Sequence, residues 1–130
     1  MEAEPSKRCV VVVEDDPQAR FALERLLTMS GFQVYSAAGV GEAMEIVRAH
    51  GCDLLISDLQ LPDGSGLDLM RRLRAAHGAA HGIALTGYTT PDHRQQCADA
   101  GFEAFLPKPV IFQSLLNEIQ RVLAPDAGPR

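Results

Sequence analysis

Short apolar runs alternate along the chain with longer stretches in which apolar residues recur at helical spacing. The runs lie at 9–13 (CVVVV), 32–37 (FQVYSA), 54–57 (LLIS), 83–86 (IALT) and 104–106 (AFL). The first run is apolar throughout and rich in β-branched valine, which is typical of a strand buried on both faces of a parallel sheet. The run at 32–37 is more polar and alternates, so we place it at an edge of the sheet.

Helices are predicted in the stretches between these runs. The first begins at Asp16-Pro17, because Asp is a good N-cap and Pro suits the first helical position, and it stops at Gly31. We expect its inward stripe to consist of Phe21, Leu23, Leu26, Leu27 and Met29. The other helices are expected at about 41–50, 67–75, 91–100 (after the second start signal, Thr90-Pro91) and 112–123.

This alternation predicts an α/β fold, a single doubly wound (βα)5 domain with a five-stranded parallel sheet and helices on both faces. In such sheets the functional crevice lies beyond the carboxyl ends of the strands, where the strand order reverses. The residues just past each strand therefore become the candidates for chemistry. They are Glu14, Asp15 and Asp16 after the first strand, Asp58 after the third, Thr86 after the fourth and Lys108 after the fifth.

Carboxylates gathered this closely would repel one another unless a cation neutralises them. Oxygen ligands with a nearby lysine suit Mg²⁺, and the lack of His or Cys in the set argues against zinc. A carboxylate such as Asp58 can also act as a nucleophile and form an acyl phosphate, while Lys108 and Thr86 bind the phosphoryl oxygens. The set therefore predicts phosphoryl transfer to an aspartate, whereas Asp16 is most simply a helix cap.

Composition narrows the class of protein. The 130 residues (14.1 kDa) are 46% hydrophobic and 22% charged, as expected for one soluble globular domain. The net charge of −5 leaves no basic footprint, so direct nucleic-acid binding is not expected. The N-terminal MEAEPSKR is no signal peptide and no apolar run could insert into a membrane, so we expect a cytoplasmic protein.

The three cysteines, Cys9, Cys52 and Cys97, form no C-x-x-C pair and lie beside apolar runs. They are interpreted as buried free thiols in a reducing compartment, with a reactive or disulfide role as the alternative. The two histidines of HGAAH, His77 and His81, are interpreted as residues of a surface loop rather than a metal pair.

Four segments, VVVEDDPQAR, LLISDLQLPDGSGLDLM, ALTGY and AFLPKPV, together resemble a two-component response-regulator receiver domain. The resemblance covers residues 7–123 and leaves 1–6 and 124–130 as flexible termini or linker. It implies a chemotaxis-regulator-like fold with strand order 2-1-3-4-5. It also implies that the protein is a regulatory phosphoacceptor and not a turnover enzyme. The phosphoacceptor would catalyse transfer of a phosphoryl group to Asp58 from a histidine kinase or a histidine phosphotransfer protein. It would also catalyse its own slow dephosphorylation.

The resemblance also assigns roles within the site. Glu14 and Asp15 would bind Mg²⁺ (Mn²⁺ could substitute) together with Asp58 and the backbone carbonyl of Gln60. Thr86 and Lys108 match the switch hydroxyl and the invariant lysine, and a cis peptide is implied at Lys108-Pro109. Phe105 matches the aromatic residue that turns inward on activation, and Gln60 and Tyr88 would tune the phosphoryl lifetime, with Tyr88 shielding the group from water.

The sequence departs from the family pattern at a few positions. The acidic pair is Glu-Asp, Ser65-Gly66 replaces the usual Asp-Gly, Phe105 lacks the hydroxyl of a tyrosine, and Gly87 leaves room beside Thr86. The hydrogen bonding of the turn at Ser65-Gly66 is therefore expected to differ from that of the family, whereas the chemistry of the site is expected to be the same.

The usual partner-binding face of the family is formed by the fourth helix, the fifth strand and the fifth helix, and a homodimer could form there. The cognate kinase and the output partner are left open. One rival function is a phosphohydrolase, which would need a second carboxylate close after Asp58, where Leu59 and Gln60 stand instead. The other is a non-phosphorylated pseudo-receiver that serves only as an interaction module.

Overall fold

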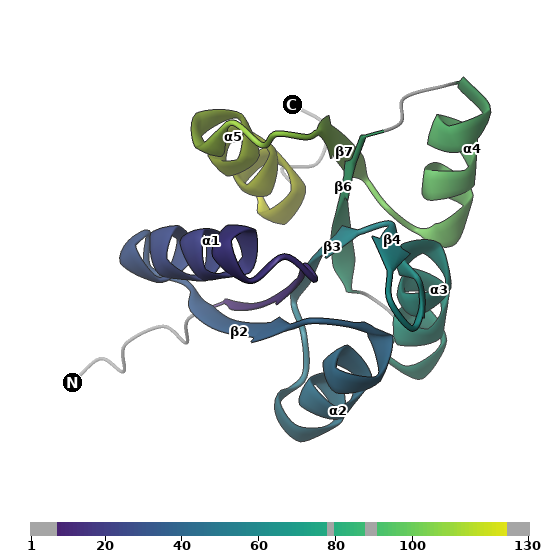
Figure 1. Cartoon of the computed structure of the whole chain (residues 1–130), viewed down its shortest axis with the longest axis horizontal. Coiled ribbons are helices and arrows are strands. Elements are labelled where there is room, and N and C mark those ends of the chain that lie inside the picture. Colours follow the sequence, from purple (N-terminus) through teal and green to yellow (C-terminus); the bar gives the residue numbers. More distant parts are fainter. Residues whose placement is uncertain (1–7, 78–79, 88–90, 125–130) are drawn as a thin grey trace.

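The computed structural model describes residues 8–77, 80–87 and 91–124, and these residues form a doubly wound α/β domain. Its main sheet is wholly parallel and has the order β2-β1-β3-β6-β7 (Figure 1). The strands are β1 (Cys9–Val13), β2 (Gln33–Ala37), β3 (Leu54–Asp58), β6 (His81–Thr86) and β7 (Ala104–Pro107). Counted among these five, the order is 2-1-3-4-5, which confirms the predicted fold class, and β2 lies at the expected edge.

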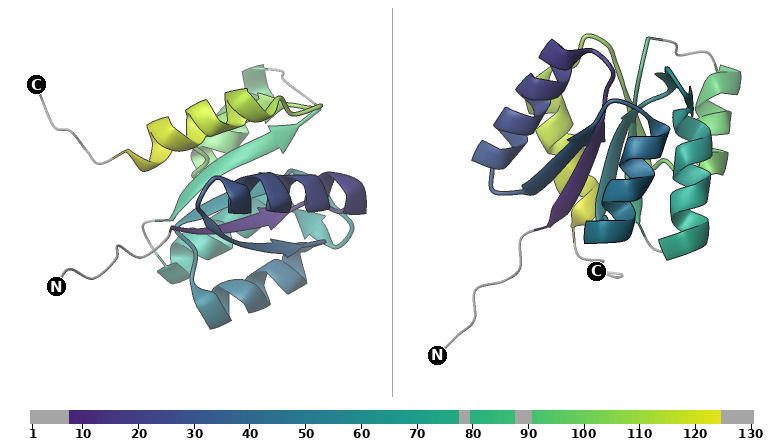
Figure 2. Two further views of the ribbon diagram at one scale, coloured as in Figure 1. Left: turned by 90° about the vertical axis from the view of Figure 1, so that its left-hand side faces the viewer. Right: turned by 60° about the horizontal axis from the view of Figure 1, so that its bottom comes forward.

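Helices cover both faces of this sheet. They are α1 (Pro17–Met29), α2 (Val40–His50), α3 (Gly66–His77), α4 (Pro91–Ala100) and α5 (Phe112–Leu123). α1 and α5 lie side by side on one face, and α2, α3 and α4 cover the other (Figures 1 and 2). The predicted helices are thus confirmed, with ends that shift by one or two residues.

β1 shows why the sheet is apolar on both sides. Val11 and Val13 pack into the cluster under α2, α3 and α4, whereas Val10 and Val12 pack into the cluster under α1 and α5. All four valines are completely buried, because successive side chains of a strand point to opposite faces.

The expected inward stripe of α1 is partly wrong. Leu23 and Leu27, four residues apart, are buried, but Phe21 and Met29 are 64% and 72% exposed and Leu26 is 38% exposed. A step of two residues turns about 200° around a helix, so residues two positions outside the Leu23–Leu27 pair face away from the sheet. The first helix therefore carries apolar side chains on its outer surface.

Two further details differ from the sequence-based prediction. A two-stranded antiparallel hairpin, β4 (Gln60–Leu61) and β5 (Gly64–Ser65), follows Asp58 and was not predicted, since two-residue strands leave no periodic pattern. The histidines of HGAAH do not share a loop: His77 is the last residue of α3 and His81 the first of β6. The imidazole Nδ1 of His81 lies 2.7 Å from Glu103 Oε1, which explains how a polar residue begins this strand.

The three cysteines are free thiols. Cys9 and Cys97 are buried, as predicted, and Cys52 is half-buried. Burial is the main cause that raises the pKa of each thiol, to about 12 for Cys52. Among the described residues, no helix has both the length and the apolar character needed to cross a membrane.

Candidate functional site

The predicted site residues lie at the carboxyl end of the parallel sheet. Glu14 and Asp15 follow β1, Asp58 ends β3, Thr86 ends β6 and Lys108 follows β7. Because β1, β3, β6 and β7 are neighbours in the sheet, residues far apart in sequence meet at one edge.

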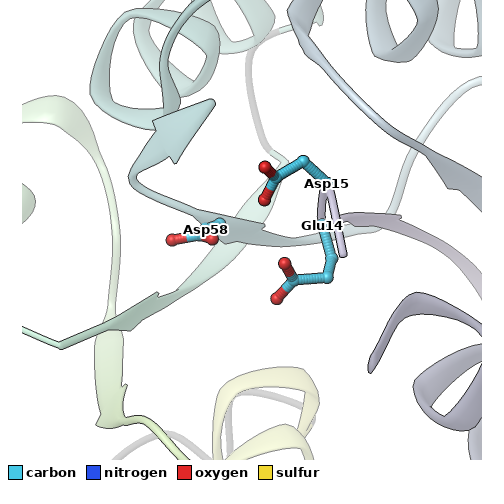
Figure 3. A group of neighbouring side chains, drawn as sticks. All are labelled: Glu14, Asp15 and Asp58. Carbon is cyan, nitrogen blue, oxygen red and sulfur yellow. The ribbon is translucent and has the colours of Figure 1, made fainter. Parts of the chain in front are cut away.

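Three carboxylates form an acidic cluster at this edge. Glu14, Asp15 and Asp58 each offer an oxygen, and these oxygens lie within 4.8 Å of one another. In Figure 3, Glu14 and Asp15 come from the end of β1 and turn their carboxylates to the side on which Asp58 lies. Glu14 is buried, Asp58 is half-buried and Asp15 is exposed, so the cluster is open to solvent on one side. An all-oxygen donor set of this kind fits a hard divalent cation, so the cluster could hold a metal ion.

Lys108 joins the buried and the half-buried carboxylate. Its Nζ lies 2.8 Å from Glu14 Oε1 and donates a hydrogen bond to Asp58 Oδ2 at 2.8 Å. Burial of the ammonium opposes its charge, but the hydrogen bonds to Asp58 and Glu14 outweigh this, and the pKa of Lys108 is raised. Lys108 therefore stays positively charged at neutral pH and offsets the repulsion between the two acids. The peptide bond from Lys108 to Pro109 is cis, as the family resemblance implied.

The turn that carries the acidic pair is fixed by hydrogen bonds at both ends. Glu14 donates from its backbone N–H to Ala37 O of the edge strand at 3.0 Å. The Asp16 carboxylate accepts from Ala19 N at 3.1 Å, which confirms its interpretation as a helix cap. Asp16 also donates from its own N–H to Glu14 Oε2, so it orients that carboxylate as well.

Arg20 is a contributor that the sequence reasoning missed. Its Nη1 donates to Glu14 O at 2.8 Å and lies 3.5 Å from Asp15 O, so it ties α1 to the backbone of the acidic turn. A usable signal was present, because an arginine in the first turn of a helix can reach back to the carbonyls that precede it.

The segment after Asp58 is held equally firmly. A Cβ at Gly66 would lie 2.2 Å from Asp58 O, so only glycine allows the chain to pass this close to the site residue. Gly66 N donates to Leu59 O and closes the β4–β5 hairpin. Ser65 Oγ accepts from Leu67 N at 3.0 Å, so serine supplies a hydrogen bond to the start of α3 at the position where the family usually has aspartate.

Asp63 links this hairpin to α2. Its carboxylate accepts from Val40 N at 2.7 Å and from Gly41 N at 3.0 Å, and these backbone hydrogen bonds lower the pKa of Asp63. The sequence reasoning missed this contact, since Asp63 in Pro-Asp-Gly has the pattern of an ordinary turn residue.

A second part of the site lies between Asp58 and α4. A cavity of about 220 Å³ is lined by Asp58, Leu59, Gln60, Thr86, Gly87 and His93. His93, which was not singled out from the sequence, belongs to α4, and its Nε2 lies 3.4 Å from Thr86 Oγ1. Within the described part of the chain, and apart from its two chain neighbours, no atom lies within 4 Å of a Cβ built on Gly87, in agreement with the room expected there. Tyr88 falls outside the described residues.

Phe105 lies apart from the acidic cluster, on β7. Its ring is half-buried, and the guanidinium carbon of Arg94 lies 4.8 Å from the ring centroid. An apolar groove of about 400 Å³ opens on the other side of Lys108, where Leu23 and Leu26 of α1 face Pro109, Val110 and Phe112.

Comparisons with known proteins agree with this geometry. Residues 10–120 match the family model of the response regulator receiver domain. The chain is 31% identical over 123 residues to the response regulator MprA of Mycobacterium sp. (strain KMS), covering 92% of this chain and 54% of MprA. It is 36% identical over 105 residues to the response regulator protein PilR of Pseudomonas aeruginosa, covering 81% of this chain and 24% of PilR.

Solved structures show the same likeness. Chemotaxis protein CheY4 of Vibrio cholerae superposes with a TM-score of 0.86 at 28% identity, covering 91% of this chain and all of CheY4. The non-phosphorylated HemR receiver domain of Leptospira biflexa gives a TM-score of 0.85 at 28% identity, covering 95% and 99% of the two chains. The chain thus spans about half the length of MprA, but nearly the whole of these receiver structures. The chain belongs to the response-regulator receiver family.

Proposed function

We propose that Asp58 accepts a phosphoryl group from a phosphohistidine donor in a Mg²⁺-dependent reaction that the receiver itself catalyses. The observation that carries this proposal is the acidic cluster together with Lys108, whose ammonium lies 2.8 Å from both Glu14 and Asp58. A histidine kinase or a histidine phosphotransfer protein would be the donor, as the resemblance implies.

In the transfer, a carboxylate oxygen of Asp58 attacks phosphorus. The new O–P bond forms as the P–N bond of the donor breaks, and the electron pair returns to the imidazole nitrogen of the donor. Lys108 and the Thr86 hydroxyl bind equatorial oxygens of the phosphoryl group. Glu14, Asp15, Asp58 and the carbonyl of Gln60 would hold Mg²⁺ (or Mn²⁺), which when bound neutralises negative charge on the transferring group.

The apolar groove beside Lys108 supports a protein donor. Leu26 is partly exposed there, and Ile111, just after Val110, is 68% exposed. Lys108 lines this groove and contacts Asp58, so a donor protein that covers the groove would bring its phosphohistidine close to Asp58. Burial of such apolar side chains is the usual source of affinity between proteins.

The output follows from movement of Thr86 toward the phosphoryl oxygens. Phe105 then packs into the space that Thr86 leaves, and this shifts the equilibrium between two arrangements of the α4–β7–α5 face. A downstream partner or a second copy of the chain would bind there. Slow hydrolysis resets the domain, and we predict that Tyr88→Ala shortens the phosphoryl lifetime.

Intact mass spectrometry after incubation with acetyl phosphate, with and without Mg²⁺, tests the proposal. We expect one Mg²⁺-dependent phosphoryl adduct in the wild type, none in Asp58→Asn, and an unchanged adduct in the control Asp68→Asn, which alters an exposed acid on α3. No adduct together with no Mg²⁺ binding would favour the pseudo-receiver interaction module. Sustained turnover of ordinary phosphate esters would instead indicate a phosphohydrolase.

A further inference from the structure

Two neighbouring residues at the start of α4 each contact one of the two residues expected to switch. The Nε2 of His93 lies 3.4 Å from Thr86 Oγ1, and the Arg94 guanidinium lies over the ring of Phe105 at 4.8 Å. Thr86 and Phe105 stand on the adjacent strands β6 and β7, so one turn of α4 reaches both.

His93 contacts the Thr86 hydroxyl, which is the group that would bind a phosphoryl oxygen. His93 lines the same cavity as Asp58 and Thr86. A threonine hydroxyl has a single proton to donate. In the tautomer in which His93 Nε2 accepts this proton, Thr86 cannot donate to His93 and to a phosphoryl oxygen at once. In the other tautomer Nε2–H donates to Thr86 Oγ1, and movement of the hydroxyl toward the phosphoryl group lengthens the 3.4 Å contact, so the two interactions compete in both cases.

The contact of Arg94 concerns the ring that would turn inward. Phe105 is half-buried, and the guanidinium carbon of Arg94 lies over its ring. A cation over an aromatic face is attracted by the ring quadrupole. This attraction is lost when the ring leaves its present position for the interior.

We propose that His93 and Arg94 are positioning residues that hold Thr86 and Phe105 in the non-phosphorylated arrangement and so weaken the site's affinity for a phosphoryl group. The proposal rests on the proposed function of Asp58. A ligand that prefers the other arrangement must break both contacts, and its apparent affinity falls by the free energy that those contacts supply. The structure thus assigns to α4 a direct hold on both switch residues.

Beryllofluoride, which binds a carboxylate as a phosphoryl analogue, gives the test, with its apparent dissociation constant measured in the presence of Mg²⁺. His93→Phe keeps a planar aromatic side chain and removes both ring nitrogens, and Arg94→Gln removes the cation. Each substitution should tighten beryllofluoride binding by about two- to five-fold, the range expected for one exposed contact of this kind. The double variant should show roughly the product of the two effects.

Two controls separate positioning from a general effect on the helix. Arg94→Lys keeps a cation near the ring and should remain close to wild type, and Gln96→Ala changes an exposed residue of α4. A merely structural role would lower the unfolding midpoint without tightening beryllofluoride binding. Equal or weaker binding by folded His93→Phe and Arg94→Gln would overturn the proposal. A wild-type protein that binds no beryllofluoride would overturn the proposed function, and this proposal with it.

Discussion

α1 and α4 both begin at a proline and both reach the site, but they hold different parts of it. Arg20 of α1 donates to the backbone of the acidic turn at Glu14. His93 and Arg94 of α4 contact side chains at the other end of the site. A backbone contact fixes where a ligand group stands, whereas a side-chain contact can be exchanged, so the α1 half suits binding and the α4 half suits switching.

The two helices also differ in the size of the apolar side chains that they bury. α1 inserts Leu23 and Leu27 into the core, while α4 buries only Cys97 and Ala100, which are small. The free energy of burial grows with apolar area, so α4 is held to the domain more weakly. An element with few buried apolar side chains opens or shifts at lower cost.

The largest effect should come from truncating the better-anchored helix. Leu27→Ala removes a completely buried side chain and should lower the free energy of unfolding by about 2–5 kcal/mol. Cys97→Ala on α4 removes a single sulfur and should cost about 1 kcal/mol. Urea unfolding followed by circular dichroism measures both, and equal losses would show that the helices are anchored alike.

Next in size is the loss of the α1 contact with the acidic turn. Arg20→Gln should weaken Mg²⁺ binding by about tenfold, the effect typical of losing a residue that supports metal ligands. Arg20→Lys, which keeps the charge but not the fork, should recover part of this loss. Calorimetric titration with Mg²⁺ reports the affinity directly, and an unchanged dissociation constant in folded Arg20→Gln would contradict the distinction between the two halves.

Some residues of this site could be predicted from the sequence and others could not. The difference is whether a residue's place follows from the strand topology or from the direction of a single side chain. The acidic cluster and Lys108 were predictable, because parallel strands bring the residues after their ends to one edge. Arg20, Asp63 and His93 were missed, because each acts through one side chain whose direction depends on tertiary packing.

The same limit applies to the fold. The positions of helices and strands followed from hydrophobic periodicity and cap signals, whereas the strand order was implied by the family resemblance. The outward position of Phe21 and Met29 was missed, because the expected stripe included every large apolar residue of the helix, although a position two residues outside the Leu23–Leu27 pair faces the opposite way. Three expectations stay predictions. They are the tuning of the phosphoryl lifetime by Tyr88, the binding of Mg²⁺ by the Gln60 carbonyl, and the domain boundaries at 7 and 123.

Thiol labelling compares how easily α4 and the central sheet open, and it changes neither α1 nor α4. Cys97 of α4 and Cys9 of β1 are both buried, and burial raises the pKa of both, so at pH 8 each is a neutral thiol that reacts only when exposed. In a Cys52→Ser background, we expect Cys97 to react at least about tenfold faster, since α4 opens locally at lower cost than the central sheet. Peptide mapping by mass spectrometry gives the two rates, and faster reaction of Cys9 would reverse the assignment of the weaker region.

The smallest effect should come from the outer surface of α1. Met29 is 72% exposed, so Met29→Gln removes little buried area, and its free energy of unfolding should stay within about 0.5 kcal/mol of wild type. The same substitution at Met70, which is completely buried under the sheet, serves as the matched comparison and should be strongly destabilising. A loss at Met29 as large as that at Met70 would mean that the outer face of α1 is covered in the folded protein, and the exposed apolar side chains would then belong to the core.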